Sequence, residues 1–453
     1  MNSMDAKDLH VFFLPFLAPG HMIPMIDMAR LFSSHGVKST IVTTTANSSL
    51  ISPTLCRANA NATLPINLLL LPFPSADVNL PSGHENLIYF PNPDVPEPFL
   101  AAIKLLETPF KLLLHEHQPD CIISDVFFTW STTFGIPSIL FHGSSFFTAT
   151  VSGVVARLKL QESTSGYQEP FIVPGLPHRI TLRKSLVPGM LLDESELRSQ
   201  MGASARRSFG MIGNTFYELE NDYVDLMKSW PSAIKFWNVG PVSLCNRDEL
   251  DMAARGGGGM ANSIEADECL VWLSKHRPNS VLYVSFGSMG RFTGAQLEEI
   301  AAGLEAAGHP FIWVVRDVGD EWMPNGFKER VLDEKRGLIM NGWAPQMLLL
   351  NRVEVGVEVG VRVCSSREEE RVLVKREEIK KAVEELMGDG EEKERRRERA
   401  EELKKMAEKA VEVGGSSYED LSRLIEELLE LKKRGNGSEQ GMNLTSPVEL
   451  LHF

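Results

Sequence analysis

Two side chains near position 345 could hold a ligand. Trp343 and Gln346 lie in the run Gly342-Trp343-Ala344-Pro345-Gln346, directly after the apolar stretch Gly337–Met340. That stretch predicts a buried strand, so a flat indole, a proline-stiffened turn and a carboxamide meet at its carboxyl end. Ligands of open α/β sheets bind at the carboxyl ends of the strands. An isolated tryptophan is usually a core or surface aromatic, but this context favours a binding role.

A histidine and an aspartate could supply acid–base chemistry. His21 follows a predicted strand, His10–Phe16, and stands at the entrance of a predicted helix. The partial positive charge of a helix N-terminus disfavours an imidazolium, which leaves a neutral ring available as a base. Asp125 ends a second strand, where an aspartate often caps a helix. Taken alone, each residue has an ordinary structural role, and only their positions at strand ends favour function.

A serine at the end of a third strand is the next candidate. Ser288 lies in the run VSFGSM, and the preceding Gly287 permits a close approach of the backbone to a ligand. The simpler interpretation is a serine in a β-turn.

The elements that position these residues alternate between strands and helices. Met25, Met28, Ala29 and Phe32 recur at helical spacing, as do Leu297, Ile300, Ala301 and Leu304 further along the chain. The apolar strands between such helices predict parallel sheets covered on both faces. Further strands are expected at 38–45, 67–71, 121–124, 138–141, 280–285 and 310–316.

Two such α/β units are predicted, with a cleft between them. Residues 1–243 form the first domain, 244–265 a polar, glycine-rich flexible linker, and 266–431 the second domain. The helical run after Lys375 has a charged, solvated face, and the last helix is expected at Tyr418–Leu431. Residues 432–453 are predicted to be a disordered tail.

Composition narrows the class of protein. The 453 residues are 43% hydrophobic and 23% charged, which is typical of a soluble globular protein, and the net charge of −14 argues against nucleic-acid binding. The five cysteines are scattered, so neither a metal site nor a disulfide framework is indicated. The apolar run Val11–Ala18 is too short to cross a membrane. We therefore expect a cytoplasmic protein without a metal and without stable membrane insertion.

The sequence resembles the plant family-1 UDP-glycosyltransferases of the secondary-metabolite O-glucosyltransferase type. GWAPQ opens the signature box of that family, and ENLIYFPN, PGLPHRITL, GMIGNTFYELE and ECLVWLSKHRPNSVLYVSFGSM follow its pattern in the same order. The resemblance extends over nearly the whole chain to about Leu431. It implies a GT-B-like α/β fold, in which two Rossmann-like domains face a cleft.

The resemblance also implies roles for single residues. On the donor side, Trp343 stacks on uracil, the backbone of Ala344 pairs with the uracil edge, Gln346 bonds the ribose hydroxyls, Ser288 contacts the phosphate and Ser144 lies near the sugar. On the acceptor side, His21 deprotonates the acceptor hydroxyl and Asp125 hydrogen-bonds His21. The implied partners are a UDP-sugar, most simply UDP-glucose, and a small hydrophobic acceptor such as a flavonoid, phenolic or terpenoid. The implied state is a monomer without a cofactor.

The sequence departs from the family pattern at two places. After Leu350 it passes directly to NRVEVGVEVGVRV, so the part of the box that holds the diphosphate and the sugar is missing. The stretch from Trp130 to Gly135 is about one helical turn short, which predicts a shorter helix behind Asp125 and puts the placement of that carboxylate in question. We therefore expect an incomplete second sheet and an impaired enzyme.

Two other functions are considered. The first is a catalytically inactive small-molecule-binding variant produced by internal deletion. The second, a Rossmann oxidoreductase, is disfavoured because no GxGxxG follows any predicted strand; the glycines Gly256–Gly259 follow no strand and open no helix.

Overall fold

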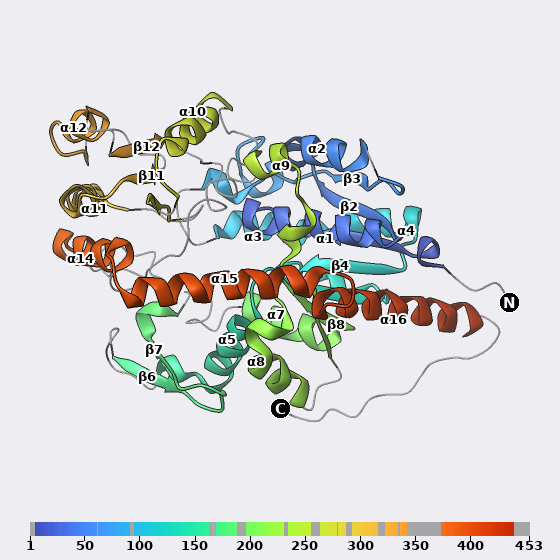
Figure 1. The fold of residues 1–453 in the computed structure, drawn as a ribbon. Helices are drawn as coiled ribbons and strands as arrows, with labels where there is room; N and C mark the ends of the chain where they lie inside the picture. Colours follow the sequence, from blue (N-terminus) through green and yellow to red (C-terminus); the bar gives the residue numbers. More distant parts are fainter. Residues whose placement is uncertain are drawn as a thin grey trace.

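The fold comprises two parallel sheets covered by helices (Figure 1). This computed structural model describes residues 5–60, 62–90, 95–162, 166, 169–187, 196–230, 234–254, 263–278, 280–286, 292–315, 322–333, 336–341, 344 and 373–438. Within them no helix is long and apolar enough to cross a membrane.

The N-terminal sheet has seven strands in the order β3-β2-β1-β4-β5-β8-β9, and every neighbouring pair is parallel. Side chains alternate across it, so Val11 and Phe13 pack into one core while Phe12 and Leu14 pack into another on the opposite face. This explains why the strands are apolar without alternation. The strands are β1 (His10–Leu14), β2 (Lys38–Thr44), β3 (Asn67–Leu71), β4 (Cys121–Asp125), β5 (Ser138–His142), β8 (Gly210–Gly213) and β9 (Lys235–Asn238).

Helices cover both faces of this sheet. Met25, Met28, Ala29 and Phe32 of α1 are buried, which confirms the predicted stripe. The helix ends where Gly36 takes a left-handed conformation with φ of 83°. The helices are α1 (Pro19–Ser34), α2 (Thr45–Ala60), α3 (Glu97–Leu105), α4 (Glu107–His117), α5 (Phe146–Leu158), α7 (Glu196–Arg207) and α8 (Tyr217–Ser229), and a small antiparallel hairpin of β6 (Pro170–Val173) and β7 (Ile180–Arg183) packs beside α5.

The C-terminal sheet has three parallel strands among the described residues, in the order β10-β11-β12. The central strand β11 is fully buried, whereas each residue of the edge strand β10 is half-buried. Leu297, Ile300, Ala301 and Leu304 of α11 are buried as predicted. The elements are α10 (Ser263–Ser274), β10 (Leu282–Val284), α11 (Gly294–Ala307), β11 (Phe311–Val315), α12 (Phe327–Asp333), β12 (Gly337–Asn341), α14 (Arg376–Met387) and α15 (Glu391–Val411).

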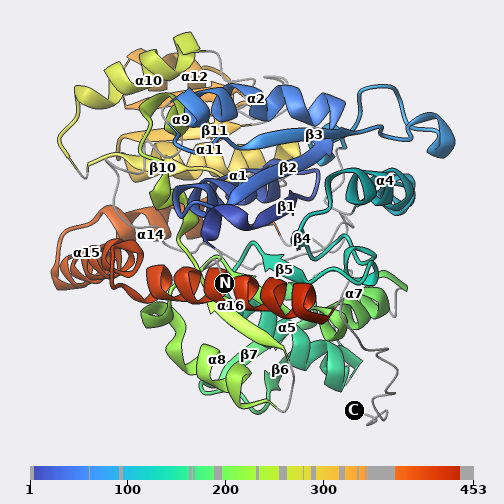
Figure 2. The ribbon, with the colours of Figure 1, turned by 90° about the vertical axis from the view of Figure 1, so that its right-hand side faces the viewer.

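The last helix returns to the first sheet. Helix α16 (Ser416–Ser438) contributes Leu421, Leu424, Ile425 and Leu428 to the core that α1 and β1 form, and it packs against β9. Figures 1 and 2 show this last helix, in red, lying against the N-terminal sheet. The sequence placed residues up to 431 in the second domain and the rest in a disordered tail. The structure differs, because α16 completes the first sheet's core and runs through Ser438.

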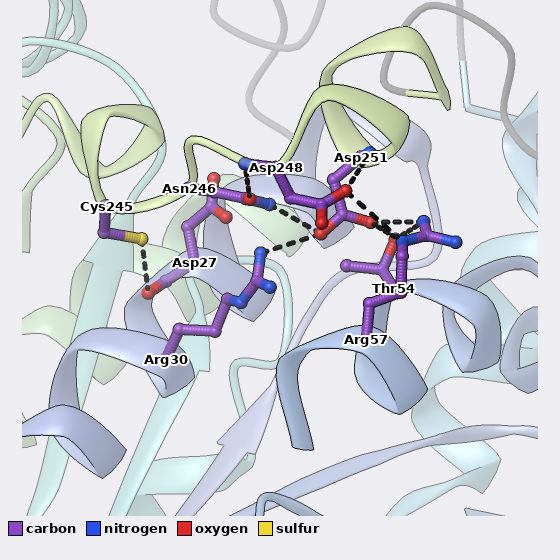
Figure 3. Close-up of polar contacts among 8 residues, drawn as sticks. All are labelled: Asp27, Arg30, Thr54, Arg57, Cys245, Asn246, Asp248 and Asp251. Atoms are coloured by element: carbon purple, nitrogen blue, oxygen red, sulfur yellow. Dashed lines mark hydrogen bonds and ion pairs between the residues drawn. The ribbon is translucent and has the colours of Figure 1, made fainter. Parts of the chain in front are cut away.

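The segment predicted to be a flexible linker is partly helical and anchored. Helix α9 (Glu249–Ala254) places Asp251, which is 1% exposed, between Arg30 of α1 and Arg57 of α2 (Figure 3). One Asp251 oxygen lies 2.7 Å from Arg57 Nε, and the other lies 3.0 Å from both Arg30 Nη1 and Asn246 Nδ2. The flexible-linker expectation is wrong for residues 244–254, because these ion pairs fix them to the first domain.

Candidate active site

The site lies where the strand order of the N-terminal sheet reverses. Strands β1 and β4 are neighbours, yet the connections from them lead to opposite sides of the sheet. Such a switch point opens a crevice at the carboxyl ends of the two strands. His21 follows β1 in the first turn of α1, and Asp125 is the last residue of β4.

The structure brings these two predicted residues together. His21 Nδ1 lies 2.7 Å from Asp125 Oδ2, and the backbone N–H of Phe127 donates to Asp125 Oδ1 over 3.2 Å. The Asp125 side chain is 1% exposed, while that of His21 is 35% exposed. A buried carboxylate therefore fixes an imidazole whose other nitrogen, Nε2, remains for a ligand.

Aromatic rings and the short connection after β4 complete the setting. Phe16 and Phe127 each meet the His21 ring edge-to-face, with centroids 5.3 and 5.8 Å away. Only the 3-10 turn Ser131–Thr133 stands in the described connection between β4 and β5, the stretch that the sequence predicted to be short. The expectation that it could displace Asp125 is wrong, because pairing of β4 with β1 holds the carboxylate in place.

Two opposing effects set the protonation of His21. Burial disfavours the imidazolium, whereas the charge of Asp125 and its hydrogen bond favour it, and together they raise the pKa of His21 above its ordinary value. The sequence predicted that the helix N-terminus would be the effect that lowers the pKa of His21. In the structure, burial is the main lowering effect.

A second histidine stands beside the pair, and the sequence analysis missed it. His142 ends β5, which pairs with β4 so that Asp125 lies opposite Phe141. The hydroxyl of Ser144, another predicted site residue, lies 2.9 Å from His142 Nδ1. The available signal was a histidine directly after a predicted strand that ended at Phe141.

The donor side is described only in part. Ala344 is 3% exposed and packs with Cys269, Ile312 and Met340 beyond the end of β12. It thus lies at the carboxyl end of a strand, as predicted. Ser288, Trp343 and Gln346 lie outside the described residues. Among the residues that the structure describes, no group of three or more His, Cys, Asp and Glu side chains could hold a metal ion.

Comparison with known proteins places the chain in a family. No model of a known protein family matches it. The anthocyanin 3'-O-beta-glucosyltransferase of Gentiana triflora is 41% identical over 479 positions, covering 93% of this chain and 98% of that protein. The scopoletin glucosyltransferase of Nicotiana tabacum is 38% identical, with 94% and 99% covered.

A solved structure agrees with these relatives. The Glycyrrhiza uralensis UGT complexed with glycyrrhetinic acid 3-O-monoglucuronide superposes with a TM-score of 0.84 at 32% identity, covering 95% of this chain and 98% of that one. The predicted GT-B fold is thereby confirmed. The chain belongs to the plant UDP-glycosyltransferase family.

Proposed function

We propose that this protein descends from, and retains the acceptor half of, an inverting O-glycosyltransferase that moves glucose from UDP-glucose to small hydrophobic acceptors. The observation that carries the proposal is the 2.7 Å contact between His21 Nδ1 and Asp125 Oδ2. Because Nδ1 is engaged, Nε2 takes the proton of the acceptor hydroxyl, and Asp125 stabilises the imidazolium that forms.

The transfer forms one bond at the anomeric carbon and breaks another. The acceptor oxygen forms a bond to the anomeric carbon, the bond from that carbon to the phosphate oxygen breaks, and UDP leaves with the electron pair. His21 keeps the acceptor proton until it is released to solvent. On the donor side we assign Trp343 to the uracil ring, the backbone of Ala344 to its edge, Gln346 to the ribose, Ser288 to the phosphate and Ser144 to the sugar, without a metal.

The acceptor class is supported by the names of relatives. A UDP-glucose flavonoid 3-O-glucosyltransferase of Fragaria ananassa is 38% identical to this chain, and the Gentiana and Nicotiana relatives act on an anthocyanin and on scopoletin. These molecules are phenols, so we propose flavonoid-like or other phenolic acceptors. We further propose that the protein is a cytoplasmic monomer.

We propose that the chain as written transfers glucose poorly or not at all. The alignment with the Gentiana relative spans 479 positions, more than the 453 residues of this chain, so that relative contains residues with no counterpart here. We place most of them after Leu350, where the family's diphosphate- and sugar-holding segment is missing. Transfer needs the anomeric carbon about 3–3.5 Å from the acceptor oxygen, and a misplacement of about 1 Å can cost 10²-fold in rate.

The second candidate function is a binder without catalysis, and the break after Leu350 favours it. The test compares the chain as written with a version in which the family's segment is restored after Leu350. Both are incubated with UDP-glucose and a panel of phenols. We expect turnover to rise at least about 10²-fold on restoration. Equal turnover would refute the deletion argument, and no turnover in either would refute the transferase assignment.

A further inference from the structure

A pair of buried serine hydroxyls closes the connection between β4 and β5. Ser124 lies one residue before Asp125 in β4, and Ser131 opens the 3-10 turn of that connection. Their hydroxyl oxygens are 2.6 Å apart, and both residues are fully buried. The hydroxyl of Ser138, the first residue of β5, lies 3.0 Å from the carbonyl oxygen of Ser131 and can donate to it. The start of the turn is thus attached to both strands.

The attachment lies on the opposite face of the sheet from the Asp125 carboxylate. Ser124 and Asp125 are consecutive residues of a strand, so their side chains point to opposite faces. Leu14, which pairs with Ser124, belongs to the same core as Phe128 and Trp130 of the connection. The chain therefore leaves β4 at Asp125, packs on the other face and returns to Ser124. Residues 124–131 form a loop that begins and ends on β4 and contains the carboxylate.

Phe127, within this loop, contacts both members of the His21–Asp125 pair. Its backbone N–H donates to Asp125 Oδ1 over 3.2 Å, which orients the carboxylate whose Oδ2 meets His21. The backbone N–H of Phe128 donates to the carbonyl of Asp125 over 3.1 Å. The Phe127 ring stacks on Phe16 with centroids 4.3 Å apart, and its centroid is 5.8 Å from that of the His21 ring. The position of the loop therefore affects how both side chains of the pair are held.

Helix α7 holds the outer side of the same connection. Arg207 donates from Nη2 to the carbonyl oxygen of Thr129 and from Nε to the hydroxyl of Thr132, each over 3.3 Å. The hydroxyls of Thr132 and the buried Ser204 are 3.2 Å apart. A connection that contains one short 3-10 turn is thus held between the sheet and a helix from further along the chain.

We propose that Ser131 is a positioning residue for the His21–Asp125 pair. Pairing with β1 fixes the backbone of Asp125, whereas the closed loop fixes the direction of its side chain. The hydroxyl of Ser131 keeps that loop closed through Ser124, and the loop holds Phe127 against the carboxylate and the imidazole. Ser131 takes part in no bond-making step. The inference rests on the proposed base, and it explains how so short a connection presents Asp125 to His21.

The test follows the titration of His21 by NMR in the full chain, with the histidine rings isotope-labelled and the His21 signal identified by its loss in His21→Gln. Burial lowers the pKa of His21, but the charge of Asp125 and its hydrogen bond raise it by more. Ser131→Ala loosens this contact, so we expect the midpoint to fall, in the same direction as in Asp125→Asn and by a smaller amount. Exchange of the Phe127 amide should become about fivefold faster, as the loss of one hydrogen bond predicts.

A double variant separates positioning from support of the fold. Ser131→Ala alone leaves the buried Ser124 hydroxyl without this partner, which destabilises the domain, whereas Ser124→Ala/Ser131→Ala removes both hydroxyls and should recover most of that stability. The double variant restores no tether, so the His21 midpoint should stay lowered. A midpoint that returns to the parent value together with stability would show that Ser131 only supports the fold.

Matched controls come from the same sheet and from α7. Ser39→Ala removes a hydroxyl that is equally buried, in β2, where it donates to the carbonyl of Val37, and should leave the His21 midpoint unchanged. Arg207→Ala releases the connection from α7 and should lower the midpoint by less than Ser131→Ala. Arg206 is likewise exposed but donates no hydrogen bond to residues 126–137, all of which the structure describes, so Arg206→Ala is its control.

The outcomes are distinct. If Asp125→Asn lowers the His21 midpoint while the Ser131 variants and Arg207→Ala leave it as in the parent, the inference is overturned and the proposed base stands. If Ser131→Ala does not fold, the double variant and Arg207→Ala give the same comparison. If Asp125→Asn itself leaves the midpoint unchanged, the His21–Asp125 contact does not form in solution, and the proposed base fails together with this inference.

Discussion

The two sheets of this protein differ in the number of strands that the described residues contribute to them. The N-terminal sheet has seven strands and is closed by segments from far along the chain, namely α9 and α16. The C-terminal sheet shows three strands among the described residues, and its edge strand β10 is half-buried. The His21–Asp125 contact lies on the first sheet, whereas the donor contacts that we propose follow strands of the second. In the proposed reaction, a change in the second sheet therefore need not displace the residues proposed to act as the base.

The largest effect is expected at the base, in the segment-restored chain. His21→Ala should lower kcat/KM by roughly 10²- to 10⁴-fold, because no other group takes the acceptor proton. Affinity for UDP should hardly change, since the base is on the other sheet. Turnover assays and calorimetry measure the two quantities. Activity within a factor of two of the parent would remove His21 from the mechanism.

The dependence of kcat/KM on pH tests the assignment of His21 as the base. Asp125 raises the pKa of His21, and a base must be unprotonated, so kcat/KM should fall as pH drops through that pKa. Asp125→Asn removes the charge that raises the pKa, and we expect the acid limb of the profile to move to lower pH while the rate also falls. A limb that stays in place would mean that another group titrates.

The next largest expected effect is a loss of stability when the attachment of residues 244–254 to the first domain is broken. Asp251→Ala leaves Arg30 and Arg57 without their buried partner and should destabilise the first domain by about 3–5 kcal/mol. Asp248 also approaches Arg57, at 3.6 Å, but its side chain is 41% exposed. Asp248→Ala should therefore cost less than about 1 kcal/mol. Hydrogen exchange in α1 and α2 measures the loss of stability in both variants. Equal losses would show that burial of Asp251 does not determine the strength of its ion pairs.

A buried histidine in the first sheet should make that domain acid-sensitive. Burial and Lys38 lower the pKa of His10 to about 4, against an opposing effect of Asp120. The unfolded state binds this proton below about pH 6.5 and the folded state does so only near pH 4. Stability is therefore full above pH 6.5 and falls by roughly 3 kcal/mol as pH drops toward 4.

Unfolding of the first domain at several pH values checks this expectation. His10→Gln should flatten the dependence between pH 6.5 and 4. The same substitution at His178, whose side chain is 60% exposed, is the control. An unchanged slope in His10→Gln would assign the acid sensitivity to other groups.

The smallest expected effect is the difference in affinity among three donor-side ligands of the chain as written. Uridine, UDP and UDP-glucose should bind with similar, weak affinities, because the residues retained there, Trp343 and Gln346, are those assigned to the nucleoside. The helix N-terminus that would favour the diphosphate belongs to the family segment that we propose is missing after Leu350. Calorimetry with the three ligands tests this. Much tighter binding of UDP-glucose would mean that phosphate and sugar sites exist and were rebuilt from other residues.

Sequence periodicity predicted what depends on local pattern, and missed what depends on distant partners. The stripes on α1 and α11 could be found because each lies within one helix. The anchored linker could not, because Asp251 meets arginines about 200 residues earlier in a segment whose composition is polar and glycine-rich. The last helix was predicted to end at Leu431 because the residues that follow are polar and aperiodic, yet α16 continues to Ser438.

The same distinction applies to the site. His21 and Asp125 were predicted from strand ends and family resemblance, and their 2.7 Å contact agrees with both. The short connection after Asp125 suggested displacement, but the parallel pairing of β4 with β1 is long-range and decides the position. His142 was missed because its place beside Asp125 depends on the pairing of β5 with β4, which is also long-range.

Because α16 packs on the first sheet, it also determines when the first domain can finish folding during translation. The apolar side chains Leu421, Leu424, Ile425 and Leu428 cover a core whose last strand, β9, ends at Asn238. The ribosome must therefore synthesise the whole donor half before the acceptor half can close. At about 5–20 residues per second this interval is of order 10–40 s. During that time the nascent chain exposes the apolar surface that α16 later covers. The first domain, although it is synthesised first, therefore exposes a surface that a chaperone can bind until the end of synthesis.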